Sequence, residues 1–174
     1  MANTYIQIGS AVTVGVSGAA TMSFTSIPAT YTDLVLKLTT RDTAATVDTG
    51  AVKVTFNSSA TGYTNRNVVG TGSATSSGTA GTTYIDAGLN ALMPTAGNTA
   101  SVFSNIELYI PDYAGSNNKS VSVDTAGENN QANTYCGLVA ALWSNSAAIT
   151  SISIAPTTLF AQYSTATLYG IKNS

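Results

Sequence analysis

Short stretches in which apolar and polar residues alternate recur from one end of the chain to the other. In residues 33–40, for example, Leu34, Leu36 and Leu38 occupy every second position. Successive side chains of a β-strand point to opposite faces, so this alternation is typical of a strand with one buried face. No stretch of about twelve residues shows the 3.6-residue period of an amphipathic helix. The pattern therefore predicts an all-β protein.

Turn residues separate the alternating stretches at short intervals. Clusters rich in Gly, Asn and Pro, such as residues 57–62 and 111–118, lie between them. Many short strands with such turns are typical of antiparallel sandwiches and barrels. We predict an antiparallel, jelly-roll-like β-sandwich of about nine to ten strands. The predicted strands are residues 4–8, 11–16, 21–24, 33–40, 52–56, 101–110, 119–125, 135–143, 149–155 and 166–171.

The length of 174 residues suits one domain, residues 1–174. Residues 1–18 predict either an N-terminal arm that adds to a neighbour's sheet or an edge hairpin of the chain's own sandwich. Residues 67–101 have the weakest pattern, and residues 70–81 are of low complexity. We expect a loop-rich insertion there, with one or two short strands.

Charged residues make up only 8% of the chain, against about 25% in typical soluble domains. By contrast, the sequence holds 28 Thr and 20 Ser. Residues 1–32 and 129–171 carry no charge at all. Uncharged faces can be buried at subunit contacts without desolvating ions. We therefore expect the terminal strands to form the shielded sheet and the contact surfaces. The charged turns at residues 41–48 and 112–128 are expected to face water or a polar partner.

The composition also argues against several functions. The six Lys and Arg are scattered and the net charge is −2, so we expect no nucleic-acid binding. The longest apolar run, residues 138–143, is far shorter than the roughly 20 residues of a membrane span. The first residues lack the basic and apolar regions of a signal peptide, so we expect synthesis in a cytoplasm.

No catalytic or metal-binding pattern stands out in the sequence. There is no His, and the single Cys136 lies in an apolar stretch that predicts a buried thiol. Most carboxylates lie at loop edges, where Asp commonly caps turns. Residues 42–48 and 124–128 do not match the calcium-loop pattern. We expect no enzyme activity, no cofactor and no bound metal.

Nine tyrosines leave two interpretations open. Tyrosines at loops and strand ends could stack on sugar rings, or they could cap the sandwich edge with the hydroxyl in water. The tyrosines at such positions are Tyr31, Tyr63, Tyr84, Tyr113 and Tyr163.

Several segments, in order along most of the chain, resemble a family of small virion proteins of tailed bacteriophages. The segments that carry the resemblance are residues 24–41, 54–57, 110–114 with 118–119, 142–143 with 148–152, and 160–171. The resemblance implies a structural role in the phage particle and brings no enzymatic signature.

We therefore expect a capsid decoration (cement) protein that binds the outer face of the major capsid protein and stabilises the shell. It would be made in the host bacterial cytoplasm and act in the virion, as a homotrimer by analogy with β-sandwich parts of other virions. The expected contact residues are Tyr5, Ile6, Ile8, Tyr113 and Tyr163. The alternative is a tail or head fibre component that adheres to host-surface glycan. A small polysaccharide-degrading enzyme is a third possibility.

Overall fold

The computed structural model describes residues 4–47, 50–88, 93–130 and 134–172. All the regular structure in these ranges is β-strand. The strands are β1 (Tyr5–Gln7), β2 (Val12–Thr13), β3 (Met22–Phe24), β4 (Asp33–Thr40), β5 (Val52–Phe56), β6 (Tyr63–Gly70), β7 (Thr75–Gly78), β8 (Ile85–Asp86), β9 (Ser104–Ile110), β10 (Lys119–Gly127), β11 (Tyr135–Trp143), β12 (Ile152–Pro156) and β13 (Thr165–Ile171).

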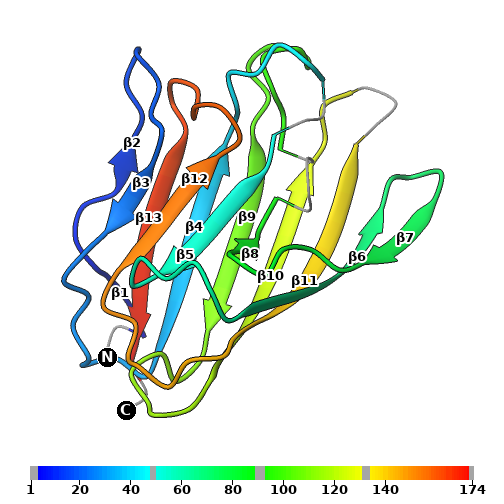
Figure 1. Ribbon diagram of the computed structural model, residues 1–174. Coiled ribbons are helices and arrows are strands. Elements are labelled where there is room, and N and C mark those ends of the chain that lie inside the picture. The colour runs from blue at the N-terminus through cyan, green and yellow to red at the C-terminus, as the bar shows by residue number, and fades with distance from the viewer. Residues whose placement is uncertain (1–3, 48–49, 89–92, 131–133, 173–174) are drawn as a thin grey trace.

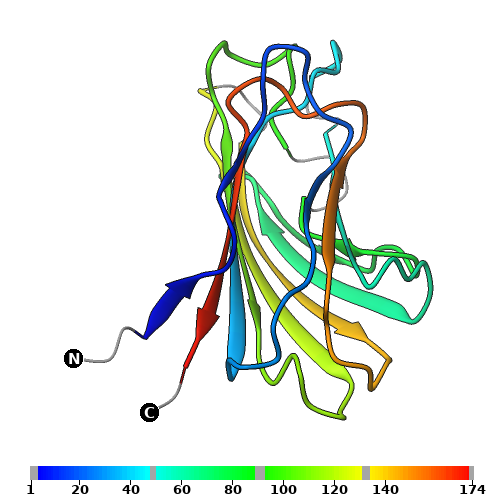
Figure 2. The same cartoon turned by 90° about the vertical axis from the view of Figure 1, so that its left-hand side faces the viewer.

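The strands form two sheets that pack face to face (Figures 1 and 2). The larger sheet has nine strands, in the order β1-β13-β4-β9-β10-β11-β6-β7, with β2 also paired to β13. The smaller sheet has four strands, in the order β3-β12-β5-β8. Every pairing between named strands is antiparallel. The predicted antiparallel β-sandwich is confirmed. The three strands outside the predicted ranges are β6, which is eight residues long, and the short β7 and β8.

The chain passes repeatedly from one sheet to the other. β3, β5, β8 and β12 belong to the smaller sheet, and the strands between them belong to the larger one. β1 and β2 both pair antiparallel with β13 of the same chain, one after the other along its length, so they form an interrupted edge strand of the chain's own larger sheet. The N- and C-terminal strands therefore lie side by side at one edge of the larger sheet (Figure 1).

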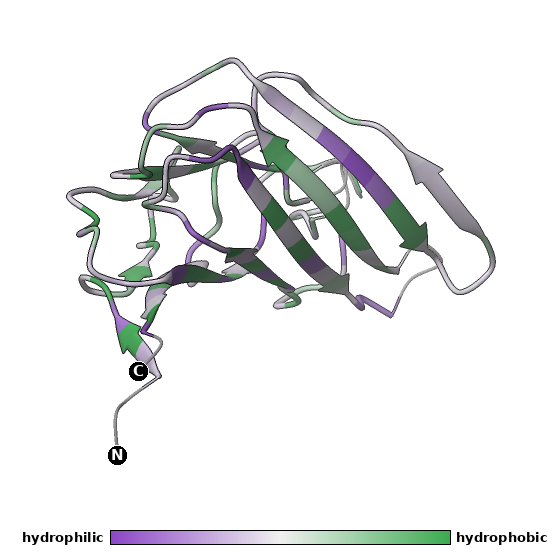
Figure 3. Ribbon diagram, turned by 90° about the horizontal axis from the view of Figure 1, so that it is seen from below, coloured by the Kyte–Doolittle hydropathy of each residue, from purple (hydrophilic) through white to green (hydrophobic). Residues whose placement is uncertain are grey.

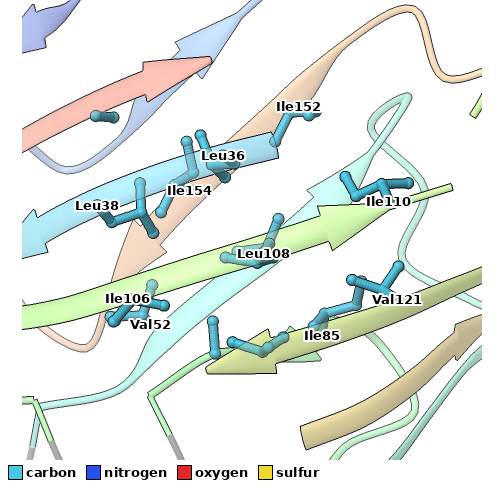
Figure 4. Packing of buried hydrophobic residues seen from close by; sticks show 14 of the residues in the cluster. Leu36, Leu38, Val52, Ile85, Ile106, Leu108, Ile110, Val121, Ile152 and Ile154 are labelled. Carbon is cyan, nitrogen blue, oxygen red and sulfur yellow. The ribbon is translucent and has the colours of Figure 1, made fainter. Parts of the chain in front are cut away.

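The core fills the space between the sheets with aliphatic side chains. Leu36 and Leu38 of β4 and Leu108 of β9 project from the larger sheet towards Val52 of β5 and Ile154 of β12 (Figure 4). All of these side chains are buried. At one end of the core an aromatic group joins the sheets: Phe56, Tyr63 and Trp143 lie with ring centroids 5.6 to 6.3 Å apart. Removal of this apolar surface from water is the main stabilising term.

Period-two alternation holds along the long strands. β10 alternates buried and exposed residues over its whole length, and Figure 3 shows hydrophobic and hydrophilic bands succeeding each other along the strands. The predicted buried thiol is wrong, because Cys136 occupies an outward position of β11 and is exposed. The predicted strand over residues 11–16 extends only over β2. Val14 is buried but Val16 is 84% exposed, because a turn closed by Gly18 N donating to Gly15 O interrupts the strand.

Strand β6 was missed because it places polar residues towards the interior. Asn65 is buried, and its Nδ2 donates to the carbonyls of Ala80, Gly81 and Tyr84 at 3.0 to 3.2 Å. The segment that follows contains the short strands β7 and β8, in agreement with the expectation for residues 67–101. Residues 89–92 of that segment lie outside the described residues.

The expectation that the charged turns face water or a polar partner is wrong at three positions. Arg41 and Asp42 at the end of β4, and Lys119 at the start of β10, are buried. Lys119 Nζ donates to the carbonyl oxygens of Gly115, at 2.7 Å, and of Asn117. Burial lowers the pKa of Lys119, and the nearby charge of Asp112 opposes this shift. These buried side chains stabilise the turns through hydrogen bonds to backbone groups. Asp48, in the same predicted turn as Arg41, lies outside the described residues.

Candidate docking face

The nine-stranded sheet has one face turned away from the four-stranded sheet, which we call the outer face. The strand registers place Lys37, Glu107 and Asp124 side by side on β4, β9 and β10. The same row continues with Leu138 on β11 and Val68 on β6. Sheets with one solvated face usually carry polar residues there, so the apolar end of this row is unusual.

A depression of about 640 Å³ lies on the outer face, and we call it the outer groove. Leu138 is 54% exposed and Val68 is 48% exposed, so large apolar side chains meet solvent here. The residues that line it are Val68, Gly70, Asn105, Glu107, Asp124, Thr125, Ala126, Cys136, Gly137 and Leu138. The groove thus combines an apolar wall from β6 and β11 with carboxylates from β9 and β10.

The electrostatics of the groove are unbalanced. Lys37 Nζ lies 2.9 Å from Glu107 Oε2, and the hydrogen bond and charge of Glu107 raise the pKa of Lys37. Asp124 lies directly across from Glu107 in the antiparallel register. Among the described residues, no ion pair reaches Asp124. The row therefore holds two carboxylates and one cation, and the cation pairs with Glu107.

The other half of the outer face is covered by the chain's own tyrosines. Tyr169, Val35 and Tyr109 are cross-strand neighbours on β13, β4 and β9, and Val35 is buried although it points outward. Tyr5 meets Tyr169 edge to face, with ring centroids 6.1 Å apart. Tyr109 donates to Asp33 Oδ2 at 2.8 Å, and this bond is the main cause of its raised pKa. In the half with the outer groove, the described residues provide no such aromatic cover.

The structure does not bring the five expected contact residues together. Tyr5, Ile6 and Ile8 lie at the β1 edge, where Tyr5 is 51% exposed and the two isoleucines are half-buried. Tyr163 is 67% exposed in the loop before β13, where its φ of 71° is unusual for a bulky residue. The expectation that Tyr113 is a contact residue is wrong. It is buried, and its hydroxyl donates to the carbonyl of Pro28, so this side chain is inaccessible to a partner.

The structure also reduces the number of tyrosines that could stack on a sugar ring. Tyr63 and Tyr113 are buried, and burial raises the pKa of both hydroxyls. Tyr31 and Tyr84 are half-buried, and the ring of Tyr84 faces Lys53 Nζ at 5.4 Å. Of the five tyrosines considered, only Tyr163 presents most of its side chain to solvent.

The buried charges at the end of β4 hold the surrounding loops through hydrogen bonds to the backbone. Arg41 donates to the carbonyls of Thr99 and Val102, both at 2.8 Å, and of Asn98 at 3.2 Å. Burial lowers the pKa of Arg41. The carboxylate of Asp42 accepts hydrogen bonds from the backbone N–H groups of residues 44, 157 and 158 at 2.7 to 3.1 Å. The two neighbours thereby fix three loops at one end of the sandwich.

The described residues contain no cluster of three or more His, Cys, Asp or Glu side chains that could hold a metal ion. No helix long and apolar enough to cross a lipid bilayer occurs in the part of the chain that the structure describes. The outer groove is therefore the strongest candidate site.

Sequence reasoning missed the groove residues Val68, Glu107, Asp124 and Leu138. The sequence does carry one signal: in residues 135–143, apolar residues occupy both even and odd positions. Leu138 and Leu142 lie at even positions, on the opposite side of the strand from the buried Val139, Ala141 and Trp143. A strand buried on one side only does not need those outward leucines.

Searches against family models, curated proteins and solved structures find no significant match to this chain.

Proposed function

We propose that the protein is a structural component of a tailed-bacteriophage particle, a decoration protein that binds the outer surface of the capsid and stabilises the shell. The observation that carries the proposal is the outer groove, a partly apolar surface that the chain's own elements leave uncovered. Exposed apolar surface of this kind is typical of protein–protein contacts.

The rest of the fold supports a binding role. Both sheets are antiparallel, and buried Arg41, Asp42 and Lys119 hold the connecting loops, so the surface is presented on a preorganised scaffold. The proposed location rests on the sequence alone, in which several segments spread along the chain resemble small virion proteins of tailed phages. A protein that binds only the assembled shell stabilises that shell by mass action.

The proposal also includes homo-oligomer formation, as a trimer. Structural proteins present in many copies commonly form closed symmetric assemblies. The mass in solution, measured by light scattering after size-exclusion chromatography, should be three times 17.7 kDa. A monomeric mass at micromolar concentration contradicts the trimer and leaves capsid binding open to its own test.

The direct test uses phage particles made without this protein. Purified protein added to them should bind to saturation, in a fixed ratio to the major capsid protein, and should raise the temperature at which the heads release DNA. Absence of binding, or binding to the tail alone, would overturn the proposal.

A fibre component that binds host-surface glycan is the second candidate, and exposed Tyr163 is the observation in its favour. It predicts saccharide binding that is lost in Tyr163→Ala. A glycan array without signal removes this candidate.

A further inference from the structure

The outer groove is chemically mixed, and its composition restricts what can fill it. Its wall is apolar, formed by Val68, Leu138 and the thiol of Cys136. Its opposite side carries the carboxylates of Glu107 and Asp124. A purely apolar partner segment would leave these carboxylates desolvated and without a counter-charge, which is costly.

The two carboxylates face each other across neighbouring antiparallel strands. Like charges in this position repel and destabilise the sheet. Lys37 Nζ lies 2.9 Å from Glu107 Oε2 and neutralises that carboxylate. The row of Lys37, Glu107 and Asp124 therefore keeps one uncompensated negative charge. Arg66 points elsewhere: it shares the outer face but donates to the carbonyl of Asn65 and does not line the groove.

We infer that the outer groove receives a Lys or Arg side chain of the capsid surface, with apolar residues beside it; this rests on the proposed function. The aliphatic stem of such a side chain packs on Leu138 and Val68. Its cationic head meets Asp124, which has no ion pair of its own among the described groups. The complement of the groove is thus one positive charge set in an apolar surface.

A second copy of this chain is a poorer complement. Its net charge is −2, and four of its six cations are already engaged. Lys37 pairs with Glu107, Lys53 lies over Tyr84, and Arg41 and Lys119 are buried against backbone carbonyls. A basic partner surface fits the groove better than this chain's own surface does.

The test measures the binding of groove variants and matched controls to particles that lack this protein. Asp124→Asn removes the charge and Leu138→Ser removes the apolar wall. Glu128→Gln and Val16→Ser make the same kinds of change at exposed positions outside the groove. Asp124→Asn should weaken binding about 5- to 20-fold at low salt, and by less at high salt, because the lost interaction is electrostatic. Leu138→Ser should weaken binding about 10-fold at both salt concentrations. The two controls should bind like the wild type.

Cys136 provides a second readout, because it lines the groove and is exposed. Alkylation of this thiol should be fast in the free wild-type protein and slow in the particle-bound protein. This measurement needs no variant, so it holds even where a substitution perturbs folding.

Each outcome decides a different point. If the wild type does not bind, the proposed function fails and this inference falls with it. If the wild type binds but the groove variants bind like their controls and Cys136 stays reactive, the groove inference alone is overturned. If Leu138→Ser weakens self-association without weakening particle binding, the occupant is a second copy and the inference is likewise wrong. If Asp124→Asn binds normally at low salt, the partner does not present a cation.

Discussion

At the scale of single residues, the scarcity of charge makes each remaining charge informative. Three of the charged side chains in the predicted turns, Arg41, Asp42 and Lys119, are buried and hydrogen-bonded to backbone groups. Burial of a charge is costly unless the charged group is fully hydrogen-bonded or paired. We therefore interpret these residues as anchors that hold the loops in place. Sequence position could not reveal this, because an acid that caps an exposed turn and an acid that anchors a buried one look alike in a one-dimensional pattern.

The substitution Asp42→Asn tests whether Asp42 anchors the loops. The carboxylate accepts from Ala44 N at 2.7 Å, Thr158 N at 3.0 Å and Thr157 N at 3.1 Å, whereas an amide turns its NH₂ group towards one of these donors. We expect a loss of about 1–3 kcal/mol in the free energy of unfolding, measured with urea.

Asp124→Asn is the matched control for this measurement. Asp124 is exposed and lies opposite Glu107, so its loss relieves repulsion and should leave the free energy of unfolding unchanged or slightly higher. Equal destabilisation by the two substitutions would refute the assignment of Asp42 as an anchor.

At the scale of strands, alternation predicted most of the fold because one face of each long strand is buried. It gave the long strands β4, β9, β10, β11 and β13 to within a few residues. It missed β6, whose inward Asn65 is satisfied by loop carbonyls, and such a partner becomes visible only in three dimensions. It also misjudged Cys136, because an apolar neighbourhood in the sequence does not show which face of the strand is covered.

Strand β11 allows a direct test of which side chains point outward and which point into the core. Cys136 is on the outward face of β11 and should react stoichiometrically with Ellman's reagent in native buffer, at a rate within about tenfold of the unfolded chain. A thiol that reacts only after unfolding in urea would show that the outward and inward positions of β11 are exchanged.

At the scale of the whole molecule, stability should fall in strong alkali. Burial raises the pKa of Tyr63 and Tyr113 above the ordinary value of about 10, so the folded state holds these protons more tightly than the unfolded state does. Their contribution is complete below pH 10 and is lost as the pH rises above it. Lys37, with a raised pKa, acts in the same direction above pH 10.5.

Lys119 acts oppositely, because its pKa is lowered by burial, but its contribution is complete once the pH reaches about 10.5. Between pH 10.5 and 11.5 the free energy of unfolding in urea should therefore decrease. The decrease should be shallower in Tyr113→Phe, which removes one of the titrating hydroxyls. A flat or rising profile in this range contradicts the buried positions of the tyrosines.

At this scale the outer face also divides into two halves with different surfaces. Tyr5, Tyr109 and Tyr169 cover the half around Val35, whereas the half with Leu138, Val68 and the two carboxylates stays open. The strands of this face could be predicted from the sequence, but their order in the sheet could not. That order brings Glu107, Asp124 and Leu138 into one row, although they are up to 31 positions apart in the chain.

The most direct measurement is cryo-electron microscopy of the phage particle at a resolution that shows side chains. We predict sandwich density on the outer surface of the capsid, with the outer face of the nine-stranded sheet against the shell and a Lys or Arg of the major capsid protein beside Asp124. Density for this chain on the tail only, or on the capsid with the outer groove open to solvent, would contradict the account.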